Sequence, residues 1–224
     1  EGLKDRFTCI RYDLRGHGDS PRPDTPFSLH DLVDDLEALR SALGIERAHF
    51  AGHSLGGMIG PAYARRYPDR VRSLGLWSTA AFRTPDDSAK VNAVVSAMRE
   101  KGIPQVLDTL SARWFTDKFI DERPDLIEKR KQQVIDTPVE VFLNVFDIYA
   151  QTEMAPWLHE ISAPCQLVTG AQDSGCNPRL NREIADALPN AELVILDNLK
   201  HAIFIEATER VLPIFRDFLI KQDD

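Results

Sequence analysis

Apolar residues along the chain fall into short continuous runs separated by longer stretches of helical spacing. The runs predict five strands, at residues 7–12, 48–51, 71–77, 165–170 and 191–196. Between them, apolar residues recur every three or four positions. Residues 28–44 are the clearest case, with a capping serine, one apolar face and a terminal glycine. Strands that alternate with helices predict an α/β protein with a mainly parallel sheet flanked by helices.

Residues 82–160 show helical spacing and no strand. Pro104, Pro124 and Pro138 mark expected helix starts within this stretch. We therefore expect a core built from residues 1–81 and 161–224 and a helical lid built from residues 82–160. Such a lid would exclude water and form the walls of a pocket, although each wall candidate could equally belong to the lid's own core. The candidates are Trp77, Met98, Trp114, Phe142, Phe146 and Trp157.

Residues 52–56 read Gly-His-Ser-Leu-Gly, which fits the Gly-x-Ser-x-Gly turn between a strand and a helix. The strand at 48–51 and helical spacing from 55 to 67 supply that context. Ser54 would then stand on a strained turn, with glycines on both sides because a Cβ there would collide with neighbouring chain. The first N–H groups of the helix would point to where an oxyanion forms. The pattern favours acyl transfer, and the alternative is an ordinary glycine turn.

A serine hydroxyl needs a base to take its proton and an acid to orient that base. Asp173 follows the strand at 165–170, and His201 follows the strand at 191–196, so both lie at carboxyl ends of strands, where open α/β sheets gather their sites. Asp197 and Glu206 are alternatives to Asp173 that lie beside the histidine in sequence. A structural or solvated role is expected for the other histidines, which are His17, His30, His49, His53 and His159.

The order serine, acid, histidine and the sequence of residues 12–20, Tyr-Asp-Leu-Arg-Gly-His-Gly-Asp-Ser, resemble the α/β-hydrolase family. Residues 113–116, Arg-Trp-Phe-Thr, and the general run of residues 77–201 resemble the 3-oxoadipate enol-lactonases and their relatives. The resemblance implies an α/β-hydrolase fold. It also implies that Ser54 is the nucleophile, His201 the general base and then acid, Asp173 the orienting acid, and the Leu55 N–H one oxyanion donor.

The chain departs from this family at its beginning. Residues 7–12 correspond to the family's fourth strand, so the first three strands are missing from this sequence. In the family the third strand lies between the fourth and fifth, so we expect a gap with unpaired backbone groups on both sides. The loop after that strand normally carries a second oxyanion N–H, whose loss costs on the order of 10²–10³ in turnover. We expect a longer chain, or another segment, to complete the sheet.

The sequence thus predicts a serine hydrolase that cleaves a small ester or lactone through an acyl-enzyme, without a metal or organic cofactor. An enol-lactone substrate would carry carboxylates, and Arg113 and Arg83 are the candidate cations for them, although either could be an exposed surface arginine. The predicted substrate-binding residues are Trp77, Arg113, Trp114 and Trp157. Three alternatives stay open: carbon–carbon bond hydrolysis, cofactor-free perhydrolysis, and a ligand-binding or signalling protein with little turnover.

Composition narrows the expected partners and location. The net charge of −8 argues against nucleic acid, and no apolar run approaches the roughly 20 residues that span a bilayer. The 3 cysteines lack metal-ligand spacing and fit reduced thiols in the cytoplasm. We expect a cytoplasmic protein that binds a small molecule and neither nucleic acid nor membrane. Apolar faces of the lid could also support a homo-oligomer.

Overall fold

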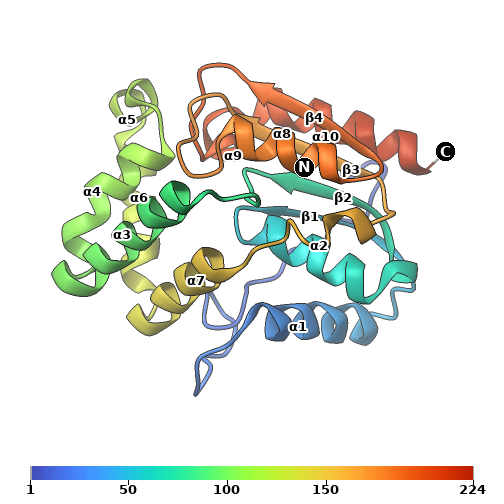
Figure 1. The fold of residues 1–224 in the computed structure, drawn as a ribbon, viewed down its shortest axis with the longest axis horizontal. Coiled ribbons are helices and arrows are strands. Elements are labelled where there is room, and N and C mark those ends of the chain that lie inside the picture. The colour runs from blue at the N-terminus through green and yellow to red at the C-terminus, as the bar shows by residue number, and fades with distance from the viewer. Residues whose placement is uncertain (1, 224) are drawn as a thin grey trace.

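The computed structural model describes residues 2–223, in which four parallel strands form one sheet in the order β1-β2-β3-β4 (Figure 1). Leu76 of β2 pairs with Leu167 of β3, which pairs in turn with Leu193 of β4. This sheet confirms the predicted α/β class. The strands are β1 (Ala48–His53), β2 (Val71–Trp77), β3 (Cys165–Gly170) and β4 (Ala191–Leu196).

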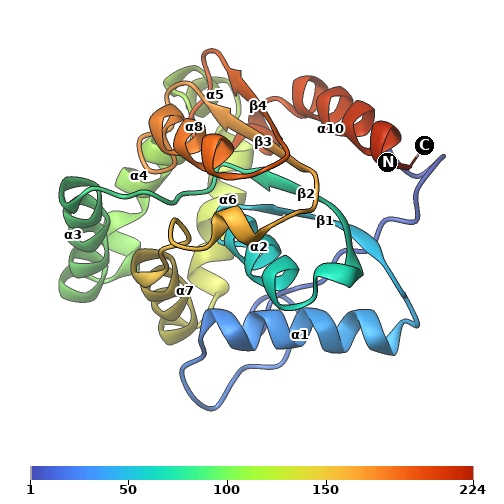
Figure 2. The same ribbon diagram turned by 45° about the vertical axis from the view of Figure 1, so that its right-hand side comes forward.

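Helices cover both faces of the sheet. Helices α2 and α8 pack on one face, with α1 against α2, whereas α10 packs on the opposite face (Figure 2). Successive side chains of a strand point to opposite faces, so Leu74 and Leu76 join the core under α2, whereas Trp77 packs against Phe215 of α10. The helices are α1 (Leu29–Ala42), α2 (Gly56–Arg66), α3 (Pro85–Lys101), α4 (Ile103–Trp114), α5 (Asp117–Glu122), α6 (Pro124–Asp136), α7 (Val139–Gln151), α8 (Pro178–Ala187), α9 (Ile203–Glu206) and α10 (Thr208–Asp223).

The prediction of a strand at residues 7–12 is wrong. The chain there has no regular secondary structure, and Ile10 and Tyr12 are 48% and 38% exposed. A strand needs a neighbour to receive its backbone hydrogen bonds, and none of the four described strands pairs with this segment, although the Phe7 ring packs 6.0 Å from the His49 ring of β1. The expected gap inside the sheet therefore does not form. Instead, β1 is an edge strand and is mostly half-buried, whereas all 6 residues of β3 are buried.

Helices α3 to α7, called the lid below, lie between β2 and β3 in sequence and gather beyond the carboxyl ends of the strands (Figure 1). Pro104 and Pro124 stand in the first turns of α4 and α6, and Pro138 directly precedes α7, which confirms the expected helix starts. Met98 and Phe142 pack together in a hydrophobic cluster of the lid itself. Within residues 2–223, no helix combines the length and apolar character that crossing a bilayer requires.

The exposed edge of β1 leads to a prediction for hydrogen exchange. In a parallel sheet, an edge strand directs every second N–H away from its only neighbour. In a protein made of these 224 residues, we expect alternate amides of β1 to exchange at least about 100-fold faster than the amides of β3, measured by NMR under native conditions. Uniform protection along β1 would contradict this prediction, because it would require a further segment to cover that edge.

Candidate active site

Ser54 occupies a strained turn between β1 and α2. Its φ is +55°, a left-handed conformation that costs a non-glycine residue about 1–2 kcal/mol. Three hydrogen bonds hold it there. The Ser54 N–H donates to the Trp77 carbonyl at 2.8 Å, and the Ser54 carbonyl accepts from the Gly57 N–H at 3.0 Å and from Thr79 Oγ1 at 3.2 Å. The end of β2 therefore fixes the position of the serine.

The two glycines that flank this turn differ in how much space a side chain would have. A Cβ on Gly52 would lie 2.2 Å from the backbone of Gly56, which is far inside contact distance. A Cβ on Gly56 would have no heavy atom within 4 Å. The expectation of a steric need for glycine thus agrees with the structure at Gly52 and is wrong at Gly56.

Asp173 and His201 meet at the ends of β3 and β4. The Asp173 side chain is buried, and its Oδ2 lies 2.7 Å from His201 Nδ1. Its Oδ1 accepts the N–H groups of Gly175 at 2.9 Å and Cys176 at 2.8 Å. The close approach depends on Gly170, where a Cβ would lie 2.2 Å from the Lys200 carbonyl oxygen. The carboxylate is therefore held on both of its oxygens.

The contact between Asp173 and His201 shifts the pKa of both side chains. Burial alone would raise the pKa of Asp173, but the charge and hydrogen bond of His201, with the two N–H donors, give a net lowering. Burial alone would likewise lower the pKa of His201, but the Asp173 carboxylate raises it above its ordinary value. The pair thus favours an ionised Asp173 and a more basic His201.

Two further side chains hold the backbone of His201. The His53 Nε2 lies 2.8 Å from the His201 carbonyl oxygen, and Ser78 Oγ donates to the same oxygen at 3.3 Å. Burial, and then the nearby charge of His201, lower the pKa of His53 to about 3, so its ring is neutral and donates from Nε2. The sequence predicted a structural or solvated role for His53. In the structure, His53 supports the backbone of His201.

One cavity of about 100 Å³ brings these groups together. Ser54, Leu55, Asp173 and His201 line it from the core side. The lid supplies an apolar wall that consists of Val91, Val94, Leu110, Trp114, Val145 and Phe146. Polar groups also reach the cavity: Arg113 and Tyr149 from the lid, and Ser174 and Cys176 from the loop after β3.

Two predicted substrate-binding residues lie elsewhere. Trp77 does not line the cavity, because the alternation of β2 turns it to the opposite face, where its ring packs 4.2 Å from Phe204 and 4.7 Å from Phe215. Trp157 lines a separate surface hollow of about 960 Å³ between α1, α2 and α7, with the Arg65 guanidinium 5.2 Å from its ring centre. Neither tryptophan lines the cavity at Ser54.

Of the two arginine candidates, only Arg113 is among the residues that line the cavity. Arg113 lines the cavity, and no hydrogen bond or ion pair to it is found among the described residues. Arg83 lies behind the wall, with its guanidinium 4.3 Å from the Tyr149 ring centre and donating to the Thr152 carbonyl at 2.9 Å. Arg113 is therefore the cation that is available to a bound anion.

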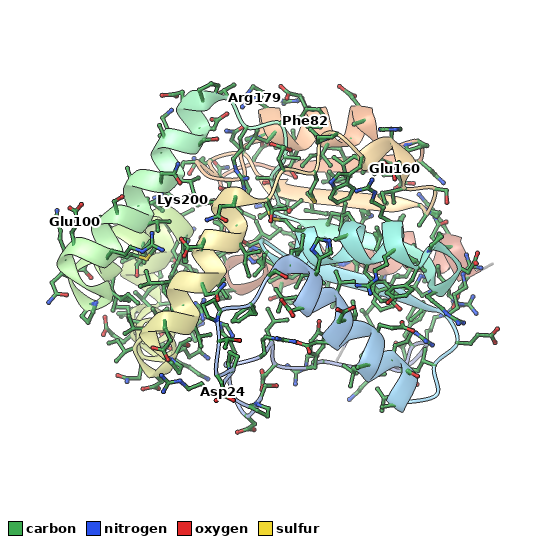
Figure 3. The ribbon with its side chains drawn as sticks, turned by 60° about the horizontal axis from the view of Figure 1, so that its bottom comes forward. Asp24, Phe82, Glu100, Glu160, Arg179 and Lys200 are labelled. Carbon is green, nitrogen blue, oxygen red and sulfur yellow. The ribbon has the colours of Figure 1, made fainter. Side chains whose placement is uncertain are left out.

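Ion pairs and hydrogen bonds anchor the lid to the core. The N–H groups of Phe82 and Arg83, before α3, donate to the Glu153 carboxylate after α7, which ties the two ends of the lid together. Arg179 of α8 donates to the carbonyl of Phe82, and both residues are labelled in Figure 3. Arg179 also pairs with Asp87. The base of the lid is thus fixed on the side of α8.

A second set of bonds joins the lid to the loop of His201. The Ala202 N–H donates to the Trp114 carbonyl at 2.8 Å, and the Thr116 hydroxyl donates to Glu206 at 2.6 Å. Lys200, labelled in Figure 3, donates to the Ala112 carbonyl at 2.9 Å. The residues on both sides of His201 are therefore bound to the end of α4.

Comparison with known proteins identifies the family. A family model described as the alpha/beta hydrolase fold matches residues 1–208. The chain belongs to this family. The chain is 32% identical to 3-oxoadipate enol-lactonase 2 of Acinetobacter baylyi, over 76% of its own length and 63% of that relative, which is less than two thirds of the relative's length. It is 28% identical to enol-lactonase 1 of the same organism, over 97% and 80% of the two chains.

Solved structures agree with this assignment. The enol-lactonase of Burkholderia xenovorans LB400 superimposes with a TM-score of 0.89 at 29% identity, over 98% of the present chain and 83% of that chain. The expected resemblance to enol-lactonases is confirmed. The sequence did not indicate a role for Cys176 or Tyr149. The only available signal for Cys176 was its position 3 residues after Asp173, in a loop that returns to the site.

The glycines of the turn offer a matched pair of variants. Gly52→Ala should lower the free energy of unfolding by about 3 kcal/mol or more, because its Cβ meets backbone that cannot rotate away. Gly56→Ala should change it by less than about 0.5 kcal/mol. Urea denaturation followed by circular dichroism measures both. Equal effects of the two substitutions would contradict the packing described here.

Proposed function

We propose that this hydrolase cleaves a small ester or lactone through an acyl-enzyme formed on Ser54. The observation that carries the proposal is the shared cavity, in which Ser54, on its strained turn, opens onto the same space as the hydrogen-bonded pair of His201 and Asp173. A serine, a histidine and a buried acid at successive strand ends are the parts that this chemistry needs.

In the proposed reaction, Ser54 Oγ attacks the substrate carbonyl carbon, and His201 takes the serine proton. Because Nδ1 faces Asp173, the proton goes to Nε2, and His201 then passes it to the leaving oxygen. Water releases the acyl group with His201 again acting as base. Leu55 lines the cavity, and its backbone N–H makes no hydrogen bond among the described residues. We therefore assign this N–H as a donor to the oxyanion. No metal or organic cofactor takes part.

The cavity also supports a substrate class. Its small volume and its apolar lid wall favour a compact substrate, and Arg113 gives the wall a single cation without a described partner. We propose that Arg113 binds a carboxylate of the substrate and that Trp114 packs beside it. The similarity to enol-lactonases supports a lactone that carries such a group. The free thiols of Cys9, Cys165 and Cys176 support the proposal that the reaction takes place in the cytoplasm.

A fluorophosphonate probe tests the nucleophile. We expect one adduct per chain by intact mass, none in Ser54→Ala, and a loss of ester turnover of about 10⁶-fold in that variant. Ser174→Ala is the matched control, since Ser174 lines the same cavity but lies outside the turn, and it should keep the adduct. An adduct that remains in Ser54→Ala would refute the assignment, and an adduct without ester turnover would favour a protein that keeps the reactive serine but only binds its ligand.

Arg113→Leu tests the substrate class. Loss of a hydrogen bond to a charged group costs about 1.5–3 kcal/mol, so KM for an ester that carries a carboxylate should rise about 10- to 100-fold. The neutral methyl-capped analogue should be affected by less than about twofold. Steady-state kinetics on both esters provide the comparison, with the exposed lid residue Arg123, changed to leucine, as the control. Equal losses on the two esters would exclude Arg113 as the carboxylate partner.

A further inference from the structure

Cys176 brings a thiol to the paired acid and histidine. One atom each from Asp173, Cys176 and His201, a carboxylate oxygen, Sγ and a ring nitrogen, lie within 4.8 Å of one another. The three side chains line the same cavity, and Cys176 is only 1% exposed. Its Sγ lies 3.1 Å from the Tyr149 hydroxyl. The proposed hydrolysis uses the Cys176 N–H to hold Asp173 but gives the sulfur no task.

The other thiols have different surroundings. Cys165 lies in β3 with Sγ donating to the Ala163 carbonyl at 3.2 Å, and burial raises its pKa to about 12. Cys9 is exposed, and its Sγ donates to the Phe7 carbonyl at 3.7 Å. Among residues 2–223, the group at Cys176 is the one set of three or more such side chains close enough to share an ion.

A thiolate, an imidazole and a carboxylate are a donor set that binds Zn²⁺ and its softer analogue Cd²⁺. Zinc lies about 2.3 Å from sulfur and about 2.0–2.2 Å from nitrogen or oxygen, so tetrahedral donors are about 3.5 Å apart. The most widely spaced donors would therefore approach by about 1 Å. Asp173 Oδ2 and His201 Nδ1, now 2.7 Å apart, would move apart by about 0.8 Å, so that the ion replaces their hydrogen bond. A fourth position would face the cavity and take water, as in sites with three protein ligands.

We propose that Asp173, Cys176 and His201 form a reversible site for a soft divalent cation, Zn²⁺ or Cd²⁺, and that an ion bound there stops hydrolysis. The Cys176 thiol releases its proton to solvent as the sulfur–metal bond forms. The Nδ1 proton of His201, which Asp173 now accepts, moves through water to Nε2, so that Nδ1 gives its lone pair to the ion. His201 then has no free pair for the serine proton. The binding stands independently of the proposed function, whereas the inhibition rests on it.

Cadmium measures the binding directly. The chelator-treated protein is titrated with Cd²⁺, and the ultraviolet charge-transfer absorption of the cadmium–thiolate bond is followed. We expect saturation at one ion per chain. Cys176→Ser should abolish the band, and the matched control Cys165→Ser should retain it. No band in the unaltered protein, or an undiminished band in Cys176→Ser, would overturn the proposal.

Two more variants separate folding, binding and catalysis. His201→Gln keeps the thiol but removes one ligand, and should weaken Cd²⁺ at least about tenfold, since even outer partners of ligands contribute 10- to 100-fold. An unchanged Cd²⁺ affinity in His201→Gln would exclude His201 as a ligand and contradict the proposed site. Ser54→Ala should bind Cd²⁺ as the unaltered protein does, which shows binding even if no ester is ever turned over. Where turnover is found, Zn²⁺ should inhibit it and a chelator should restore it; full turnover at saturating Zn²⁺ would refute the inhibition.

Discussion

The buried hydrogen bond between Asp173 and His201 is the interaction on which the geometry of the site depends. A carboxylate that is 3% exposed is costly unless its oxygens are satisfied, and here two N–H groups and one imidazole satisfy them. Those partners come from the turn after β3 and the loop after β4. The bond therefore constrains the conformation of these two loops. Their close approach also requires glycine at position 170, because a Cβ there would collide with the backbone of Lys200.

The parallel sheet makes this meeting possible. The carboxyl ends of neighbouring parallel strands lie at one edge, so residues far apart in sequence converge there. The order of strands explains why the positions of Ser54, Asp173 and His201 could be read from the sequence. Each of them lies in the turn or loop that follows a run of apolar residues recognisable as a strand, and the structure gathers all three in one cavity.

Other features could not be read in this way because they depend on neighbours in space. Residues 7–12 have the composition of a strand but lack a described partner, and Gly56 has the sequence pattern of a constrained glycine but open space around it. The side on which Trp77 lies depends on the register of β2, and a one-residue change would have reversed it. Cys176 is near His201 only because two loops fold onto each other, which no spacing along the chain reveals.

The bonds between the end of α4 and the loop of His201 connect shape with chemistry. Trp114 forms part of the cavity wall, and its own carbonyl holds Ala202, the residue next to His201. Any displacement of the end of α4 would therefore also move the backbone next to His201, the proposed base. The wall that shapes the cavity and the loop that carries His201 are thus one mechanically coupled unit, so a change in the shape of the wall cannot leave the position of His201 untouched.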